Sequence, residues 1–100
     1  MAVWEVIQLT IAEGNQDEFE SVVRSHLPLL KEADGCLDVK LLPAVDKEGV
    51  VLLWVLWQSL EHHTEVFVKT EAFTTFPSAM MPFFAATPEV LHARTVIDSF

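Results

Sequence analysis

The chain is short of cysteine, glycine and basic residues, and each shortage removes a class of function. Its single cysteine, Cys36, excludes an internal disulfide framework and is typical of a protein in the reducing cytoplasm, where we expect this one to be. With three glycines the chain has no GxGxxG loop, so a Rossmann-bound NAD or FAD is not expected. Six Lys and Arg against fifteen Asp and Glu argue against a nucleic-acid partner, because phosphate binding needs clustered basic side chains.

Long hydrophobic runs and metal-binding motifs are also missing. The longest apolar run, VVLLWVLW at residues 50–57, is far shorter than the ~20 residues that a membrane helix needs. The opening MAVWEVIQLT carries Glu5 and no basic segment, so no signal peptide is expected. Neither HxH nor CxxC occurs, and no two histidines are spaced i,i+4. We therefore expect neither a membrane partner nor a metal.

Apolar residues, by contrast, are abundant. They make up 51% of a chain of 100 residues, which we expect to form one domain over residues 1–100. A chain of this size buries only a modest core. The excess apolar surface needs a cover, and a second copy of the chain is the simplest one. A homodimer is therefore predicted.

Strand and helix signals alternate along the first half of the chain. Residues 2–11, AVWEVIQLTI, predict a strand. A helix with one apolar face is expected over about 16–33, with Asn15 as its N-cap. Pro28 falls inside this helix and predicts a kink or an irregular last turn, because proline lacks the backbone N–H.

The second half of the chain repeats the alternation. Strands are predicted at 36–43 and 50–57, and the unbroken apolar run of the second favours burial on both faces. A helix is expected from Leu60, a second helical piece over 73–84, and a final strand over 89–97. The order strand, helix, strand, strand, helix, strand predicts a ferredoxin-like α+β sandwich, a four-stranded antiparallel sheet with helices on one face. The other face would meet a partner's sheet.

Two stretches of sequence carry a family resemblance. DGCLDV at residues 34–39 and WQSLEHHTEVFVKTEAFTTF at 57–76 resemble the antibiotic biosynthesis monooxygenase family of dimeric α+β barrels, and the resemblance covers essentially the whole chain. It implies a ferredoxin-like fold paired into a dimeric barrel, and oxidation of an aromatic molecule by dioxygen without a cofactor. The same architecture also carries haem-degrading enzymes, isomerases, cyclases and proteins with no known reaction, so the fold alone does not decide the activity.

The resemblance also implies roles for single residues. Trp57 stands where the family's cofactor-free polyketide oxygenases carry a Trp beside the aromatic substrate. Leu53 and His63 replace an Asn and a Tyr of those enzymes, and this chain has no tyrosine at all. The three signature residues of the haem-degrading branch are also replaced, by Ile7 or Gln8, Phe67 and Pro77. Haem degradation is therefore not expected.

His63 is the predicted base of such a reaction. A cofactor-free oxygenase must remove a proton from a phenol or carbon acid, so that the carbanion can pass an electron to dioxygen. The ordinary imidazole pKa near 6.5 suits that step, and burial would keep the ring neutral. The alternative interpretation is a histidine that is turned inward and bonded only to a backbone carbonyl or water.

Four further side chains are predicted substrate contacts: Phe67, Phe73, His26 and Trp54. Each of them has an ordinary structural interpretation as well, as core, interface or rim. Trp54 and Trp57 lie on opposite faces of one strand, so one faces the helices and the other the partner. The face taken by His92 depends on the register of the last strand.

The predicted function is that of a homodimeric, cofactor-independent monooxygenase acting on a flat, apolar, oxygenated aromatic molecule. Trp57 would pack on the ring system and His63 would act as the base. Two alternatives stay open: a cyclase or isomerase of a polyketide-like or lactone substrate, and a non-enzymatic small-molecule-binding or structural dimer.

Overall fold

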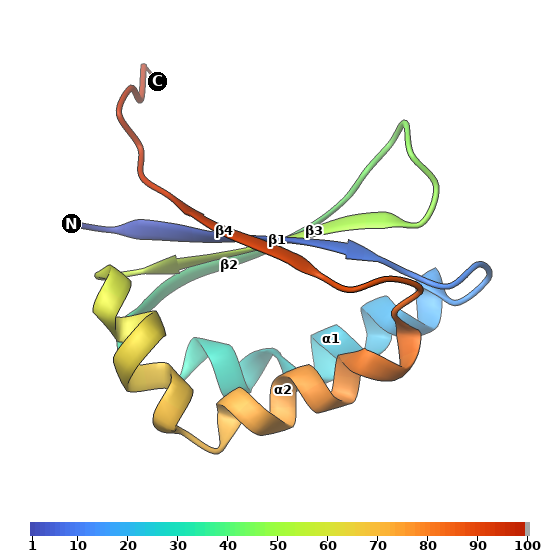
Figure 1. Ribbon diagram of the computed structural model, residues 1–100, viewed down its shortest axis with the longest axis horizontal. Coiled ribbons are helices and arrows are strands. Elements are labelled where there is room, and N and C mark those ends of the chain that lie inside the picture. Colours follow the sequence, from blue (N-terminus) through green and yellow to red (C-terminus); the bar gives the residue numbers. More distant parts are fainter. Residues whose placement is uncertain (100) are drawn as a thin grey trace.

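A four-stranded antiparallel sheet with its helices on one face makes up the computed structural model, which describes residues 1–99 (Figure 1). The strands are β1 (Val3–Thr10), β2 (Cys36–Pro43), β3 (Val50–Trp57) and β4 (Glu89–Ala93), in the spatial order β2-β3-β1-β4. This order, with helices between β1 and β2 and between β3 and β4, is the ferredoxin-like topology and confirms the predicted fold class. Within residues 1–99, no helix is both long and apolar enough to span a membrane.

Five helical segments connect the strands. They are α1 (Gln16–Lys31), the π-helical turn η1 (His62–Val66), the 3₁₀ turn η2 (Phe67–Lys69), α2 (Ala72–Met80) and the 3₁₀ turn η3 (Met81–Phe83). The regular helix that was predicted from Leu60 is wrong in its geometry, because Phe67 donates its N–H to the carbonyl of His62, five residues back. Such π turns are rare and often occur at functional sites.

The ends of two predicted elements need correction. The last strand ends at Ala93 rather than at residue 97. Ala93 pairs with Trp4, so a longer β4 would extend past the N-terminal end of β1 and would find no partner there. Helix α1 continues through Pro28 and ends at Lys31, where Ala33 N–H bonds the carbonyl of Leu30 in a tighter turn. Asn15 stands at its N-cap without a side-chain capping bond.

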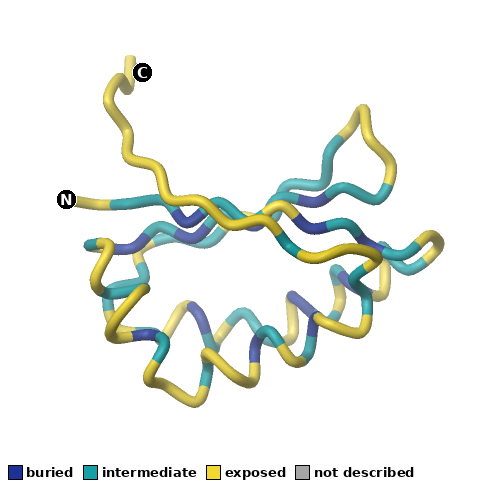
Figure 2. The backbone as a smooth tube through the Cα atoms, in the orientation of Figure 1, coloured by how far each residue is buried: buried dark blue, intermediate teal, exposed yellow. Residues whose placement is uncertain are grey.

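The two faces of β3 have different surroundings. Buried and half-buried residues alternate along it (Figure 2). The buried set belongs to the core between the sheet and the helices: Val51, Leu53, Val55 and Trp57. The other set, which includes Trp54 and Leu56, lies on the helix-free face and is half-buried in the single chain. The prediction that β3 is buried on both faces therefore holds, within the single chain, for the face that packs on the helices.

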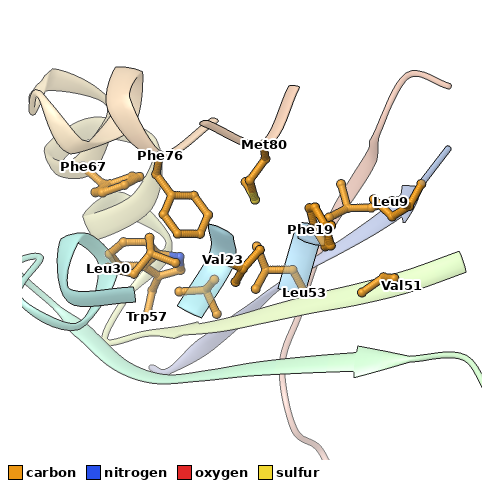
Figure 3. Close-up of a cluster of buried hydrophobic side chains, with 12 residues drawn as sticks. Leu9, Phe19, Val23, Leu30, Val51, Leu53, Trp57, Phe67, Phe76 and Met80 are labelled. Atoms are coloured by element: carbon orange, nitrogen blue, oxygen red, sulfur yellow. The ribbon is translucent and has the colours of Figure 1, made fainter. Parts of the chain in front are cut away.

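The core lies between the sheet and the helices. Figure 3 shows Trp57 at one end of it, close to Leu30, Phe67 and Phe76, with Leu9 and Val51 at the far end. Trp57 is fully buried, as are Phe19 and Val51. The end of the core that holds Trp57 is also the end at which polar side chains enter it.

Candidate functional site

Glu5 and Trp57 form the buried centre of the candidate site. In the antiparallel pairing of β1 with β3, Glu5 lies opposite Val55, so its side chain shares the helix-facing side with Trp57. The indole Nε1–H of Trp57 donates a hydrogen bond of 3.0 Å to Oε1 of Glu5. Glu5 is 8% exposed and is the one buried charged side chain among residues 1–99. A carboxyl group in such a position needs polar partners, because an unpaired buried charge is costly.

The π turn η1 brings His63 onto this pair. Its Nε2 lies 3.3 Å from Oε2 of Glu5, and its ring stacks on Trp57 with centroids 5.5 Å apart and planes 14° apart. Phe67, four residues further along, packs on the same indole with centroids 5.0 Å apart. The irregular turn thus points two rings at Trp57 from one short segment.

His92 approaches His63 from strand β4. It lies directly opposite Glu5 in the β1–β4 pairing, which answers the open question of its face in favour of the helix side. Its Nε2 is 2.8 Å from Nδ1 of His63, a hydrogen bond between two imidazole rings. Both ring nitrogens of His63 therefore have a neighbour, a buried carboxyl on one side and an exposed imidazole on the other.

Burial shifts the acidities of Glu5 and His63 in opposite directions. It raises the pKa of Glu5 above its ordinary value, an effect that the Trp57 hydrogen bond and the charge of His92 partly oppose. It lowers the pKa of His63 below its ordinary value of 6.5, which favours the neutral ring beside Glu5. The same cause, burial, thus shifts the pKa of the carboxyl and the pKa of the imidazole toward each other.

A small cavity opens beside this pair, between the sheet and helix α2. Its volume is about 70 Å³, and Glu5 and His63 are the titratable side chains in its wall. The remaining lining residues are apolar or aromatic: Ile7, Leu30, Leu53, Val55, Phe67, Phe73, Phe76, Pro77 and Met80. Larger hollows lie elsewhere, such as one of about 330 Å³ beside Cys36, but the buried carboxyl and imidazole are not in its wall.

One residue of the cavity wall, Phe73, is exposed to solvent. Phe73 is 40% exposed and meets Phe67 edge-on, with centroids 5.9 Å apart and planes at 83°. Typical ligand pockets have volumes of roughly 300–1,000 Å³, so this cavity of about 70 Å³ is too small, as it stands, for a flat molecule of several fused rings.

Four of the six predicted site residues come together here, and two do not. Trp57, His63, Phe67 and Phe73 form one aromatic cluster, but Trp57 is fully buried behind His63 and Phe67 and is not in the cavity wall, so it does not face a ligand there as predicted. Trp54 lies on the helix-free face of the sheet and packs on Trp4, with centroids 5.7 Å apart. His26 lies on α1, where its Nδ1 bonds the carbonyl of Val22 at 2.8 Å, so neither side chain reaches this cavity.

The sequence prediction missed Glu5 and His92. A signal for Glu5 was present, because it is the single charged residue in the first strand and shares its parity with Ile7 and Leu9, which face inward. No such signal existed for His92. Its position depends on the β1–β4 register, which brings together residues 87 positions apart.

Comparison with known proteins supports one family. The family model for antibiotic biosynthesis monooxygenases matches residues 2–78. The uncharacterized protein YczJ of Bacillus subtilis is 30% identical over 94 residues, which are 94% of this chain and 99% of that protein. A crystal structure from Bordetella bronchiseptica, named for antibiotic biosynthesis monooxygenase, matches with a TM-score of 0.91 at 25% identity, over 96% of this chain and 98% of the other.

A further structure supports the fold alone. SnoaB, a cofactor-independent oxygenase from Streptomyces nogalater, matches with a TM-score of 0.82 at 18% identity, over 98% of this chain and 96% of the other. At that identity the likeness shows the arrangement of strands and helices alone.

Proposed function

Because this chain belongs to the antibiotic biosynthesis monooxygenase family, we propose that it is a cofactor-independent monooxygenase that oxidises a flat aromatic molecule, polyketide-like or quinol-like, with dioxygen. The observation that carries the proposal is the apolar cavity with Glu5 and His63 in its wall. An apolar pocket with a few convergent polar groups of shifted pKa is the usual form of an active site.

His63 acts as the base in this reaction. The neutral ring takes a proton from the acidic CH₂ of the substrate and leaves a carbanion, and the carboxyl of Glu5, 3.3 Å from Nε2, stabilises the imidazolium that forms. The surrounding apolar side chains keep water away from the carbanion. Trp57 supports the imidazole ring by stacking and holds Glu5 by its hydrogen bond.

The oxygen chemistry needs no further reagent. The carbanion gives one electron to dioxygen, and the resulting carbon radical and superoxide combine to a peroxide anion. The proton held by His63 returns to the outer oxygen, and the hydroperoxide then loses water, which breaks the O–O bond and removes the second hydrogen of the carbon. The sum is R₂CH₂ + O₂ → R₂C=O + H₂O, in which carbon is oxidised and dioxygen is reduced.

The active form in this proposal is a homodimer that pairs the helix-free faces of two sheets. That face carries a broad apolar set: Trp4, Val6, Leu42, Leu52, Trp54, Leu56 and Leu91. We also propose a cytoplasmic location, where Cys36 stays a thiol.

Oxygen uptake tests this function. The purified protein would be given a panel of hydroxyanthrones and quinols, with chelator present and no flavin, nicotinamide or metal added. Uptake matched mole for mole by ketone or quinone is the expected result. Conversion of the same compounds without uptake would indicate a cyclase or isomerase instead. Quenching of tryptophan fluorescence with no conversion would indicate a binding protein, and both outcomes contradict the proposal.

A further inference from the structure

His92 extends the candidate site to the protein surface. It lies outside residues 2–78, the part of the chain that matches the family model, and all five residues of β4 are exposed. Its imidazole is nevertheless held in a defined position. The ring centroid is 5.0 Å from that of His63, and the two facing nitrogens are 2.8 Å apart.

Three titratable side chains that differ in solvent exposure thus form one line of successive contacts. Glu5 is buried, His63 is half-buried and His92 is exposed. The contacts between neighbours are 3.3 Å from Glu5 Oε2 to His63 Nε2, and 2.8 Å from His63 Nδ1 to His92 Nε2. An imidazole can accept a proton at one nitrogen while it gives one up at the other, so His63 can pass a proton along this line.

We propose that His92 is the solvent end of a proton relay through His63, which carries the substrate's proton out of the cavity while the carbanion reacts with dioxygen. This inference rests on the proposed function, because it uses His63 as the base. In this relay His63 donates its Nδ1–H to Nε2 of His92, so its Nε2, which lies 3.3 Å from Oε2 of Glu5, carries no proton and can accept one. When a proton arrives at Nε2, the Nδ1 proton moves to His92, which releases its own Nδ1 proton to water.

The relay has a purpose in a cavity of this kind. A proton that remained on His63 would lie next to the carbanion and would return to carbon before dioxygen arrived. Its transfer to His92 moves the positive charge to an exposed ring, where water solvates it. The reverse transfer supplies the proton to the peroxide anion, so the overall reaction stays balanced. His92 never touches the substrate in this scheme and acts through His63.

The test measures proton exchange in the absence of oxygen. A hydroxyanthrone is incubated under argon in D₂O with the protein, and deuterium at the acidic carbon is followed by NMR. The wild type is expected to exchange well above the rate of buffer alone. His92→Ala should slow the exchange at least about tenfold, and added imidazole should restore it, because a small buffer can replace the missing ring. Val90→Ala, on the same face of β4, is the matched control and should exchange like the wild type.

Several outcomes would overturn the relay. Exchange by His92→Ala at the wild-type rate would show that protons leave without it. Slower exchange that imidazole does not restore would mean that His92 only supports the structure. If the wild type itself does not exchange, the proposed function fails for this substrate, and the relay is then decided by ¹⁵N NMR of the free protein. A scalar coupling between the Nδ1 of His63 and the Nε2 of His92 is expected, and its absence would refute the relay.

Discussion

The indole nitrogen of Trp57 donates a hydrogen bond to Glu5 over 3.0 Å, although 52 residues separate them in the chain. The antiparallel pairing of β1 with β3 creates this contact, and both side chains are buried. The bond stabilises the charged carboxylate, since it opposes the effect of burial on the pKa of Glu5. It also fixes the oxygen atoms against which His63 packs.

Trp57→Phe should lower the free energy of unfolding by about 1–3 kcal/mol, because it leaves Oε1 of Glu5 without its donor and a gap beside the ring. The measurement is urea denaturation followed by circular dichroism. Trp54→Phe is the control and should cost less, because the Trp54 indole N–H has no acceptor within residues 1–99. Equal losses in the two variants would contradict the role given to the hydrogen bond.

Glu5 should make stability depend on pH in a characteristic direction. Its folded pKa is raised above its unfolded value of 4.5, so the folded state binds the proton more tightly. The resulting stabilisation is complete below about pH 4.5 and is lost as the pH rises through the folded pKa. Glu5→Gln keeps an acceptor for Trp57 and removes the titration. The stability of this variant relative to the wild type should therefore increase from about pH 4 to about pH 8, and a difference that stays constant across this range would contradict the assignment.

A comparison of Gly35 with Gly14 isolates the close packing of Gly35 against His62 in η1. Both have φ of +83°, which costs an L-residue about 1–2 kcal/mol. A Cβ at Gly14 would meet nothing within 4 Å, whereas one at Gly35 would overlap the ring of His62 and lie 2.8 Å from its Cβ. Gly35→Ala should therefore lose about 1–3 kcal/mol more than Gly14→Ala in thermal or urea unfolding. Similar losses would show that His62 can move away without cost.

The proposed dimer predicts that a charge on the helix-free face separates the subunits. Leu52 lies on this face of the central strand β3, and Leu52→Glu would bury a carboxylate between the sheets. Light scattering should give twice the chain mass for the wild type and the single chain mass for this variant. Val45→Glu, in an exposed loop, is the control and should stay dimeric. A monomeric wild type would exclude the dimer.

The sequence was most informative where local pattern decides structure. The strands at 36–43 and 50–57 were predicted at their observed bounds. For the second strand, periodicity alone also allowed a buried helix, and the β-branched and aromatic residues with the flanking Gly49 favoured a strand. The separation of Trp54 from Trp57 onto two faces follows from the period of two in a strand. The order of the predicted strands and helices supplied the topology, and the family resemblance directed attention to Trp57 and His63.

The sequence was least informative where distant segments meet. The π turn at 62–66 bonds five residues back, a pattern that the apolar spacing of the segment does not distinguish from an ordinary helix. The end of β4 is determined by where β1 begins, and the position of His92 by the register between these two strands. Both depend on pairing across most of the chain, which a single sequence does not encode locally.

Incorporation of labelled oxygen tests most directly whether the site at Glu5 and His63 oxygenates an aromatic substrate without a cofactor. The protein would be treated with chelator and incubated with a hydroxyanthrone under ¹⁸O₂, and the ketone would be examined by mass spectrometry, alongside His63→Ala. The account predicts one ¹⁸O atom per new carbonyl in the wild-type product, and a rate in His63→Ala lower by about 100-fold or more. Unlabelled product, or a His63→Ala variant that works at the wild-type rate, would contradict it.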